Sequence, residues 1–267
     1  MQIEFIDHTN DELSAMQGLS RDGLYGDGFF TTGTIKIGEI QHWDYHLERV
    51  LFSASRLYFV DFSLEFFRAS IEKLVENVAQ AAFRISITRC QKSRGYGISG
   101  SALSLCRLNL FPLPPSRIQY CDLVIANTPI SVNPYFAGIK HLNRLDSVLA
   151  SSEIRDENQE VLMCNGELVI SGSKCNLFLL INGQWHTPLI DLAGVNGITR
   201  LRILKMMANK GIHCHKSRVR RNELINVEAA FVCNSLIGIW PATRIQGKIL
   251  DTLPSIKLQQ FLEKGGC

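Results

Sequence analysis

The sequence predicts an α+β protein with two domains, a small N-terminal α/β domain and a larger, β-rich C-terminal domain. Two observations lead to this prediction. Segments with strand spacing and segments with helix spacing occur in separate runs and do not alternate regularly as βαβ units. Prolines at positions 112, 114 and 115 interrupt the hydrogen bonding of both helices and strands. We therefore predict a small domain over residues 1–111, a linker over 112–119 and a larger domain over 120–267.

The N-terminal part is predicted to combine strands with two helices. Runs rich in Phe, Thr and Ile, or alternating between apolar and polar residues, are typical of strands. Apolar residues spaced three and four apart are typical of helices. The predicted strands are residues 29–37, 40–43, 83–88 and 102–110. The predicted helices are residues 46–58 and 64–78.

The C-terminal part is predicted to be dominated by strands. Short apolar runs separated by turn residues indicate buried strands, and Asn165-Gly166 is typical of a hairpin turn. The predicted strands are residues 122–126, 160–164, 168–170, 176–181 and 229–233. The predicted helices are residues 142–154 and 197–208.

The charge of the chain gives little indication of a macromolecular partner. Lys and Arg number 28 against 25 Asp and Glu, a net charge of +3, and we expect no nucleic-acid binding from so mild an excess. The basic cluster at residues 216–221 is interpreted as exposed surface. No apolar run approaches the roughly 18–20 residues that span a bilayer, so no membrane segment is expected.

The cysteines and the N-terminus favour a cytoplasmic location. The eight cysteines are scattered without a C-x-x-C pair, so neither a zinc site nor a disulfide framework is predicted. We expect reduced thiols that mostly fill the core. The N-terminus lacks the basic start and apolar core of a signal peptide.

Lys140 is the most conspicuous single candidate for chemistry. It lies in the segment 134–145 among apolar neighbours, and partial desolvation of an amine favours its neutral, nucleophilic form. The alternative is a lysine at a helix start whose amine reaches solvent.

Three segments have the chemistry to hold an anion. The glycine-containing turn over 193–200 precedes a predicted helix, whose first amides together with the Thr199 hydroxyl can hold a phosphate. Asn234 and Ser235 end a predicted buried strand and could add donors. Arg49 opens a predicted helix. The alternatives are an ordinary capped helix start, a polar turn and a surface ion pair, respectively.

Taken together and in this order, these segments resemble the fold-type IV pyridoxal-phosphate enzymes, whose fold is that of D-amino-acid aminotransferase. Within that group the chain is most similar to the 4-amino-4-deoxychorismate lyases. The segments that match are residues 25–32, 46–49, 93–96, 138–145, 176–178, 193–200 and 233–236. They extend over nearly the whole chain, although the short opening motif of many relatives is missing.

The resemblance implies that Lys140 is covalently linked to pyridoxal 5′-phosphate. It also implies that the phosphate is held by cationic and backbone groups of this chain. These groups are Arg49, Ile198, Thr199, Asn234 and Ser235. A homodimer is implied as well, and no metal.

Three details favour the lyases over the aminotransferases of the same fold. Phe30-Thr31 occupies a position where the aminotransferases more often have Tyr-Glu. Arg144, like His141, lies close to Lys140 as in the lyases, and Arg94 lies in a lyase-like loop.

The implied reaction converts 4-amino-4-deoxychorismate, a small molecule, to 4-aminobenzoate and pyruvate, a step towards folate. Lys140 would be the general base, and Lys140, Thr31 or Thr32 would protonate the departing enol. Arg94, then Arg144, would face the two substrate carboxylates, and Phe30 would contact the substrate.

Ser171 is a departure from the family. Aligned on residues 176–178, it stands where the family has a glutamate that pairs with the pyridine nitrogen of the cofactor. A hydroxyl can hydrogen-bond a neutral nitrogen but cannot keep it protonated. We expect this change to disfavour transamination more than β-elimination. The alternatives are a D-amino-acid or branched-chain aminotransferase, or a protein of the same fold with reduced activity.

Overall fold

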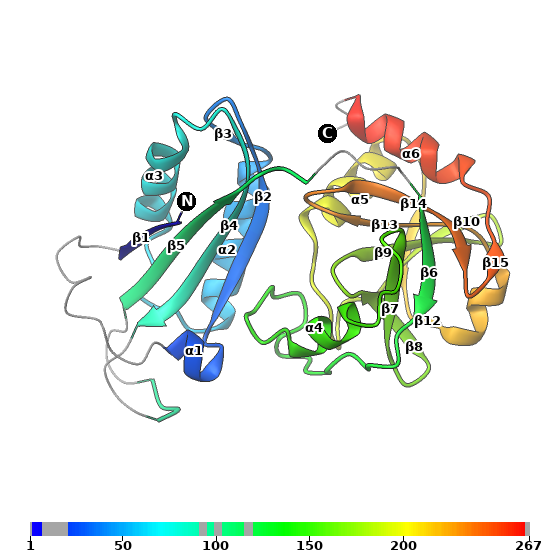
Figure 1. The fold of residues 1–267 in the computed structure, drawn as a ribbon, viewed down its shortest axis with the longest axis horizontal. Helices are drawn as coiled ribbons and strands as arrows, with labels where there is room; N and C mark the ends of the chain where they lie inside the picture. Colours follow the sequence, from blue (N-terminus) through cyan, green and yellow to red (C-terminus); the bar gives the residue numbers. More distant parts are fainter. Residues whose placement is uncertain (1, 7–20, 91–94, 99–102, 115–119, 265–267) are drawn as a thin grey trace. The chain divides into compact units, whose positions relative to one another are not determined.

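A computed structural model describes residues 2–6, 21–90, 95–98, 103–114 and 120–264 (Figure 1). The chain forms two compact units. The first unit comprises Met1–Pro115 and Ile139–Asn143, and the second comprises Ser116–Gly138 and Arg144–Cys267. The main division falls inside the predicted linker. Lys140, which we expected in the C-terminal domain, is part of the first unit because the segment around it pairs with a strand of that unit.

The first unit is built on a five-stranded antiparallel sheet. Its strand order is β1 (Gln2–Ile6), β5 (Leu103–Phe111), β4 (Gln80–Cys90), β2 (Gly28–Lys36) and β3 (Glu39–Ile40). The helices α2 (Trp43–Arg56) and α3 (Leu64–Val75) pack against one face of this sheet, and the short α1 (Arg21–Tyr25) precedes β2 (Figure 1). Side chains alternate along β2, so Phe29, Thr31 and Ile35 enter the core while Phe30 and Thr32 lie on the other face.

The second unit is built on a mixed ten-stranded sheet. The order along its main path is β11 (Cys214–Ser217), β10 (Gln184–Pro188), β9 (Asn176–Ile181), β13 (Val227–Asn234), β14 (Gly238–Ile245), β6 (Cys121–Ile125), β7 (Gln159–Asn165), β8 (Leu168–Gly172) and β12 (Val219–Arg220). The remaining strand, β15 (Lys248–Ile249), pairs with β14. The helical elements are α4 (Leu145–Ser151), α5 (Ile198–Asn209), the 3₁₀ turn Arg221–Asn226 and α6 (Leu253–Glu263).

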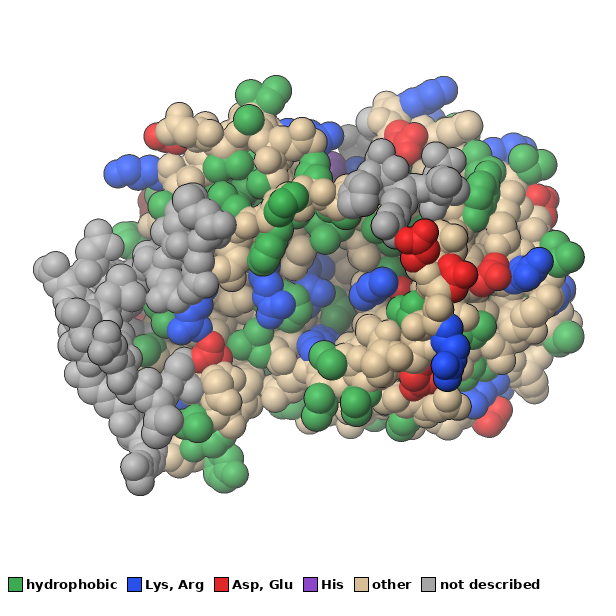
Figure 2. Space-filling view, in the orientation of Figure 1, with side chains coloured by type: hydrophobic (Ala, Val, Ile, Leu, Met, Phe, Trp, Pro, Cys, Tyr) green, Lys and Arg blue, Asp and Glu red, His purple; other side chains and the backbone are tan. Residues whose placement is uncertain are grey.

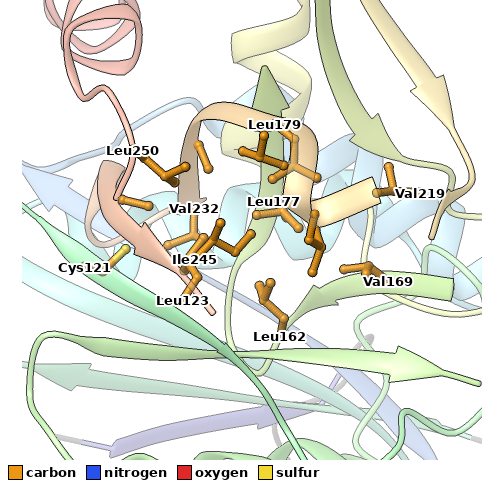
Figure 3. Close-up of a cluster of buried hydrophobic side chains, with 14 of the residues drawn as sticks. Cys121, Leu123, Leu162, Val169, Leu177, Leu179, Val219, Val232, Ile245 and Leu250 are labelled. Carbon is orange, nitrogen blue, oxygen red and sulfur yellow. The ribbon is translucent and has the colours of Figure 1, made fainter. Parts of the chain in front are cut away.

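Apolar side chains of the second unit pack on both faces of this sheet. On one face α5 and α6 cover the stacked rings of Phe178 and Phe231, whose centroids are 4.7 Å apart. Another cluster gathers aliphatic side chains from several strands, among them Leu162, Leu177 and Val232 (Figure 3). Because successive side chains of a strand point to opposite faces, apolar strands such as β9 and β13 contribute side chains to the clusters on both faces of the sheet.

Most predicted elements are confirmed, and the α+β class is confirmed with them. Strands 29–37 and 176–181 and helix 197–208 agree with the structure to within one or two residues. Helix 142–154 was predicted too long, because α4 begins only at Leu145 and the residues before it pair with β2. The predicted strand 40–43 is reduced to Glu39–Ile40, since α2 begins at Trp43.

The seven cysteines in the described part of the chain all have free thiols, and five of them are buried, as predicted. Lys and Arg side chains are dispersed among the coloured residues on the face shown in Figure 2. Among the residues that the structure describes, no helix is long and apolar enough to cross a membrane.

Candidate active site

Lys140 is held by backbone hydrogen bonds to the beginning of β2. The Phe30 N–H donates to the Lys140 carbonyl oxygen at 2.9 Å, and the Leu142 N–H donates to the Gly28 carbonyl oxygen at 3.0 Å. A bridge between Phe29 and His141 continues the same pairing. The sheet of the first unit therefore fixes the Cα position of Lys140.

The side chain of Lys140 lies against an aromatic ring. Its Nζ is 4.5 Å from the centroid of the Phe30 ring, and both side chains are half-buried. A ring face attracts a cationic amine and also restricts the rotamers of the lysine stem. The structure thus brings together Lys140 and Phe30, two of the residues that the sequence indicated.

A tight turn precedes β2 and contacts the end of the lysine segment. Gly26 has a φ of 62°, and a side chain at this position would collide with Asn143. The Asn143 Nδ2 donates to the Gly26 carbonyl oxygen at 3.1 Å. Only glycine allows this close approach without strain.

Thr31 contacts both Arg49 and a buried histidine. The Thr31 Oγ1 lies 2.6 Å from the His46 Nδ1, and the Arg49 Nη1 donates to the same oxygen at 3.4 Å. Burial, and then the charge of Arg49, lower the pKa of His46 well below its usual value, so the imidazole is neutral at pH 7. Thr31 is completely buried, and its hydrogen bonds favour a role in orienting Arg49. Thr32, on the other face of the sheet, makes no side-chain hydrogen bond with the described residues.

Asp27 organises a network of two arginines next to the same turn. Its carboxylate accepts from the Arg21 Nε at 2.7 Å and from the Arg89 Nε at 3.1 Å. Arg21 also donates to the carbonyl oxygens of Gly95 and Tyr96. This network anchors the residues that follow Arg94, which itself lies outside the described residues.

In the second unit, the start of α5 has the features of an anion site. No side chain caps this helix, so the amides of Ile198 and Thr199 have no partner within it. A side chain at Gly197 would collide with the Asn176 Oδ1, and the Asn176 Nδ2 donates to the Val195 carbonyl oxygen at 2.9 Å. The turn is thereby fixed with its amides available, and the Thr199 hydroxyl makes no side-chain hydrogen bond within the described part.

Arg200 places a positive charge directly below this helix start. It is buried, and its guanidinium donates to the Thr187 Oγ1, the Asn196 Oδ1 and the Pro188 carbonyl oxygen. All three acceptors are neutral, so the charge is not cancelled in the described part of the chain. The sequence did not indicate Arg200 as an anion-site residue, because its uncompensated charge depends on the hydrogen-bond partners that the fold provides.

Asn234 shapes the turn between β13 and β14. Its Oδ1 accepts from the amides of Leu236 and Ile237 at 2.9 and 3.0 Å, and its Nδ2 donates to the Lys174 carbonyl oxygen at 3.4 Å. Since its side chain is engaged, the group available to a ligand is Ser235, which is half-buried and makes no side-chain hydrogen bond to the described residues. The turn lies next to the α5 start, because Asn176 pairs with Cys233.

Ser171 lies near the end of β8, buried opposite Met163 of β7. Its hydroxyl makes no hydrogen bond with the described residues. The buried carboxylate of Glu160 is committed elsewhere, since its Oε1 accepts from the Ser173 N–H at 2.6 Å and the Ser173 hydroxyl at 2.8 Å. The same oxygen lies where a side chain of Gly172 would be, and successive residues face opposite sides of a strand. Glu160 therefore does not replace a carboxylate at position 171.

Arg144, the other predicted substrate residue, precedes α4 in the second unit. Burial lowers the pKa of Arg144 to about 10, against the opposing effect of Asp146, so the guanidinium stays charged at pH 7. The described site residues thus form two groups, with Phe30, Thr31, Thr32, Arg49 and Lys140 in the first unit and the others in the second.

Comparison with known proteins identifies a family. The model of the family "Amino-transferase class IV" matches residues 28–245. The aminodeoxychorismate lyase of Vibrio harveyi is 29% identical over 233 residues, covering 84% of this chain and 85% of that protein. A putative branched-chain-amino-acid aminotransferase of Methanocaldococcus jannaschii is 27% identical over 265 residues, covering 93% of this chain and 88% of that protein.

A solved structure agrees with this finding. The 4-amino-4-deoxychorismate lyase of Pseudomonas aeruginosa superposes with a TM-score of 0.90 at 29% identity, covering 98% of this chain and 99% of that one.

The neutral state of His46 predicts a pH dependence of stability. Below its usual pKa of 6.5, the unfolded chain binds a proton at His46 that the folded chain does not. The free energy of unfolding should therefore fall between pH 7 and pH 5, by up to about 1.4 kcal/mol per pH unit from this group. His46→Asn removes the titrating group while keeping a polar atom near Thr31, so urea unfolding of this variant should depend less on pH. Parallel curves for both proteins would contradict the assignment.

Proposed function

Because the chain belongs to the class IV aminotransferase family, we propose that it converts 4-amino-4-deoxychorismate to 4-aminobenzoate and pyruvate. The observation that carries this proposal is the similarity to the Pseudomonas aeruginosa lyase over 98% of the chain. The Vibrio harveyi lyase supports it from sequence. An aminotransferase activity is the second candidate, favoured by the branched-chain relative.

The cofactor of this family is pyridoxal 5′-phosphate, and the described residues fit it. When bound, the cofactor withdraws electrons from the substrate carbon that bears the amino group. The uncapped amides at the start of α5 suit a phosphate dianion, and Asn176, which packs against Gly197, fixes the turn that presents them. Below them, Arg200 adds a positive charge that no acid of the described part neutralises.

We assign the phosphate to the amides of Ile198 and Thr199 and to the hydroxyls of Thr199 and Ser235. Arg49 is kept as the cation that the sequence indicated for this role. Thr31 and neutral His46 orient Arg49, and Asn234 shapes the turn that presents Ser235. An uncharged His46 avoids a second cation next to Arg49, which would disfavour the folded state.

Lys140 has two tasks in the proposed reaction. Its Nζ would hold the cofactor covalently, and its amine would also be the base that removes the proton from the amino-bearing carbon of the substrate. The β2 pairing and the Phe30 ring restrict where this amine can move. Thr32, whose hydroxyl is not engaged in the described part, is a better proton donor to the departing enol than buried Thr31.

Ser171 favours elimination over transamination in this proposal. Its hydroxyl can donate to a neutral pyridine nitrogen but does not hold a proton on it, so the electron withdrawal is weaker. Weaker electron withdrawal would slow transamination most. Elimination would depend on it less, because the charge would leave with the enolpyruvyl group as the substrate ring becomes aromatic.

Three further parts of the proposal concern the surroundings of the site. Arg94 and Arg144 are the two candidates that the sequence indicated for contacts with a substrate carboxylate. A homodimer is supported by apolar side chains exposed on α4, at Leu145, Val148 and Leu149. A cytoplasmic location is supported by the free thiols of the described cysteines.

The lyase activity is tested with substrate generated by a synthase. The purified protein should release 4-aminobenzoate and pyruvate in equal amounts, and borohydride reduction followed by mass spectrometry should find a pyridoxyl adduct on Lys140. Lys140→Ala should lose both the adduct and about a thousandfold or more of the rate. Rapid conversion of the cofactor to its amine form by D-alanine or leucine, without 4-aminobenzoate formation, would establish the aminotransferase instead.

Ser171→Glu should shift the balance of reactions. A carboxylate at this position keeps the pyridine nitrogen protonated, so the amine-form half-reaction should accelerate relative to 4-aminobenzoate release. Ser171→Ala, which removes the hydroxyl without adding a charge, is the matched control and should not accelerate it. An unchanged ratio in Ser171→Glu would refute the role of Ser171, and a gain of lyase turnover from an inactive wild type would identify a protein of reduced activity.

The homodimer is tested by light scattering coupled to gel filtration. The wild type should elute with twice the mass of the chain. Val148→Asp should increase the monomer fraction, because a buried charge in an apolar interface is costly. Lys205→Asp, on the exposed side of α5, is the control and should leave the mass unchanged. A monomeric wild type would rule the dimer out.

A further inference from the structure

The sheet of the first unit has one polar face. On the face opposite the core, the register places Phe30 beside Ser86 and Thr32 beside Arg84. The same rows continue onto β5 with Arg107 and Asn109. The core face of these strands is mostly apolar, with Thr31 and Arg89 as buried polar exceptions. The polar residues of the opposite face form a surface on which a small molecule can be recognised.

Arg84 stands out on this face because no acid among the described residues pairs with it. Its Nε donates to the Ser86 Oγ at 3.2 Å, and it makes no ion pair with any described residue. Arg107, on the same face, is paired with Asp22. A half-buried guanidinium without an acid is costly, as the burial that lowers the pKa of Arg84 indicates. Such a cation is suited to an anionic ligand.

Arg84 and Lys140 lie against the same ring. The guanidinium carbon of Arg84 is 3.9 Å from the centroid of the Phe30 ring, and the Lys140 Nζ is 4.5 Å from it. One small molecule that contacts this ring can therefore reach both groups. A cyclic substrate with an amine at one end and a carboxylate at the other has the required arrangement.

We propose that Arg84 binds the ring carboxylate of the substrate, with Phe30 supporting the substrate ring. The inference rests on the proposed function and names a substrate residue within it. The planar fork of a guanidinium binds a carboxylate through two parallel hydrogen bonds. Contact with Phe30 and Ser86 holds the fork in place before the ligand arrives, which reduces the entropy lost on binding.

The test compares two ligands of similar shape, one with a carboxylate and one with a neutral carboxamide at the position in question. Binding of 4-aminobenzoate and of 4-aminobenzamide to the cofactor-loaded protein is measured by calorimetry. The wild type should bind 4-aminobenzoate more tightly than 4-aminobenzamide. Arg84→Met should lower the affinity for 4-aminobenzoate by about tenfold to a hundredfold and leave the affinity for 4-aminobenzamide unchanged. Arg84→Lys keeps the charge without the planar fork, so its affinity for 4-aminobenzoate should lie between those of the wild type and Arg84→Met. Arg68→Met, an exposed arginine of α3 paired with Glu72, is the control and should bind like the wild type.

Turnover adds a second measurement. In the lyase assay, Arg84→Met should raise KM with little change in kcat, and the yield of the Lys140 adduct should equal that of the wild type. If the protein makes no 4-aminobenzoate, the proposed function fails, yet the calorimetric comparison still decides the role of Arg84. Equal affinity of the wild type for the two ligands, or loss of preference in Arg94→Met but not in Arg84→Met, overturns the inference. Pyruvate binding is measured in the same way. If Arg84→Met weakens the binding of pyruvate but not of 4-aminobenzoate, Arg84 does not bind the ring carboxylate.

Discussion

The candidate site depends on the pairing of Ile139–Asn143 with the beginning of β2. The chain on both sides of this segment belongs to the second unit, yet hydrogen bonds at Phe30 and Gly28 attach the segment to the sheet of the first. Because these bonds join backbone to backbone, they fix the lysine at its Cα and leave only the side-chain torsions free. The Phe30 ring then restricts those torsions. Under the proposed function Lys140 acts as a base at one substrate carbon, and this attachment to the sheet limits the positions that its amine can take.

The arginines of the described chain fall into two kinds. Arg21 and Arg89 share the Asp27 carboxylate, and their charges stabilise the turn before β2. Arg84 and Arg200 donate only to neutral acceptors in the described part, so their charges remain uncompensated. Paired charges contribute to the fold, whereas uncompensated ones raise the local potential and attract anions. This difference makes Arg84 in the first unit and Arg200 in the second the candidates for contacts with anions.

The sequence predicted local elements well and tertiary relations less well. The strand at β2 and the helix α5 follow from side-chain spacing, because their periodicity agrees with their burial. The start of α4 was misplaced, because the residues before it have helical spacing but obtain their hydrogen bonds from β2. Lys140 could be found from its apolar neighbours and the family motif. Arg84 could not, since its significance lies in the absence of an acidic partner, which only the fold determines.

Glu160 is a buried carboxylate in the same region as Ser171, but its hydrogen bonds prevent it from replacing a carboxylate at position 171. Glu160 is completely buried, and burial raises its pKa, although hydrogen bonds from Ser173 and the charge of Lys174 oppose this shift. These donors belong to the turn between β8 and β9, so the carboxylate is used to hold that turn in place. Moving it towards Ser171 would leave the buried Ser173 hydroxyl without its acceptor. The chain therefore retains an acidic residue in this region while presenting only a hydroxyl at position 171, which is the premise of the role that we propose for Ser171.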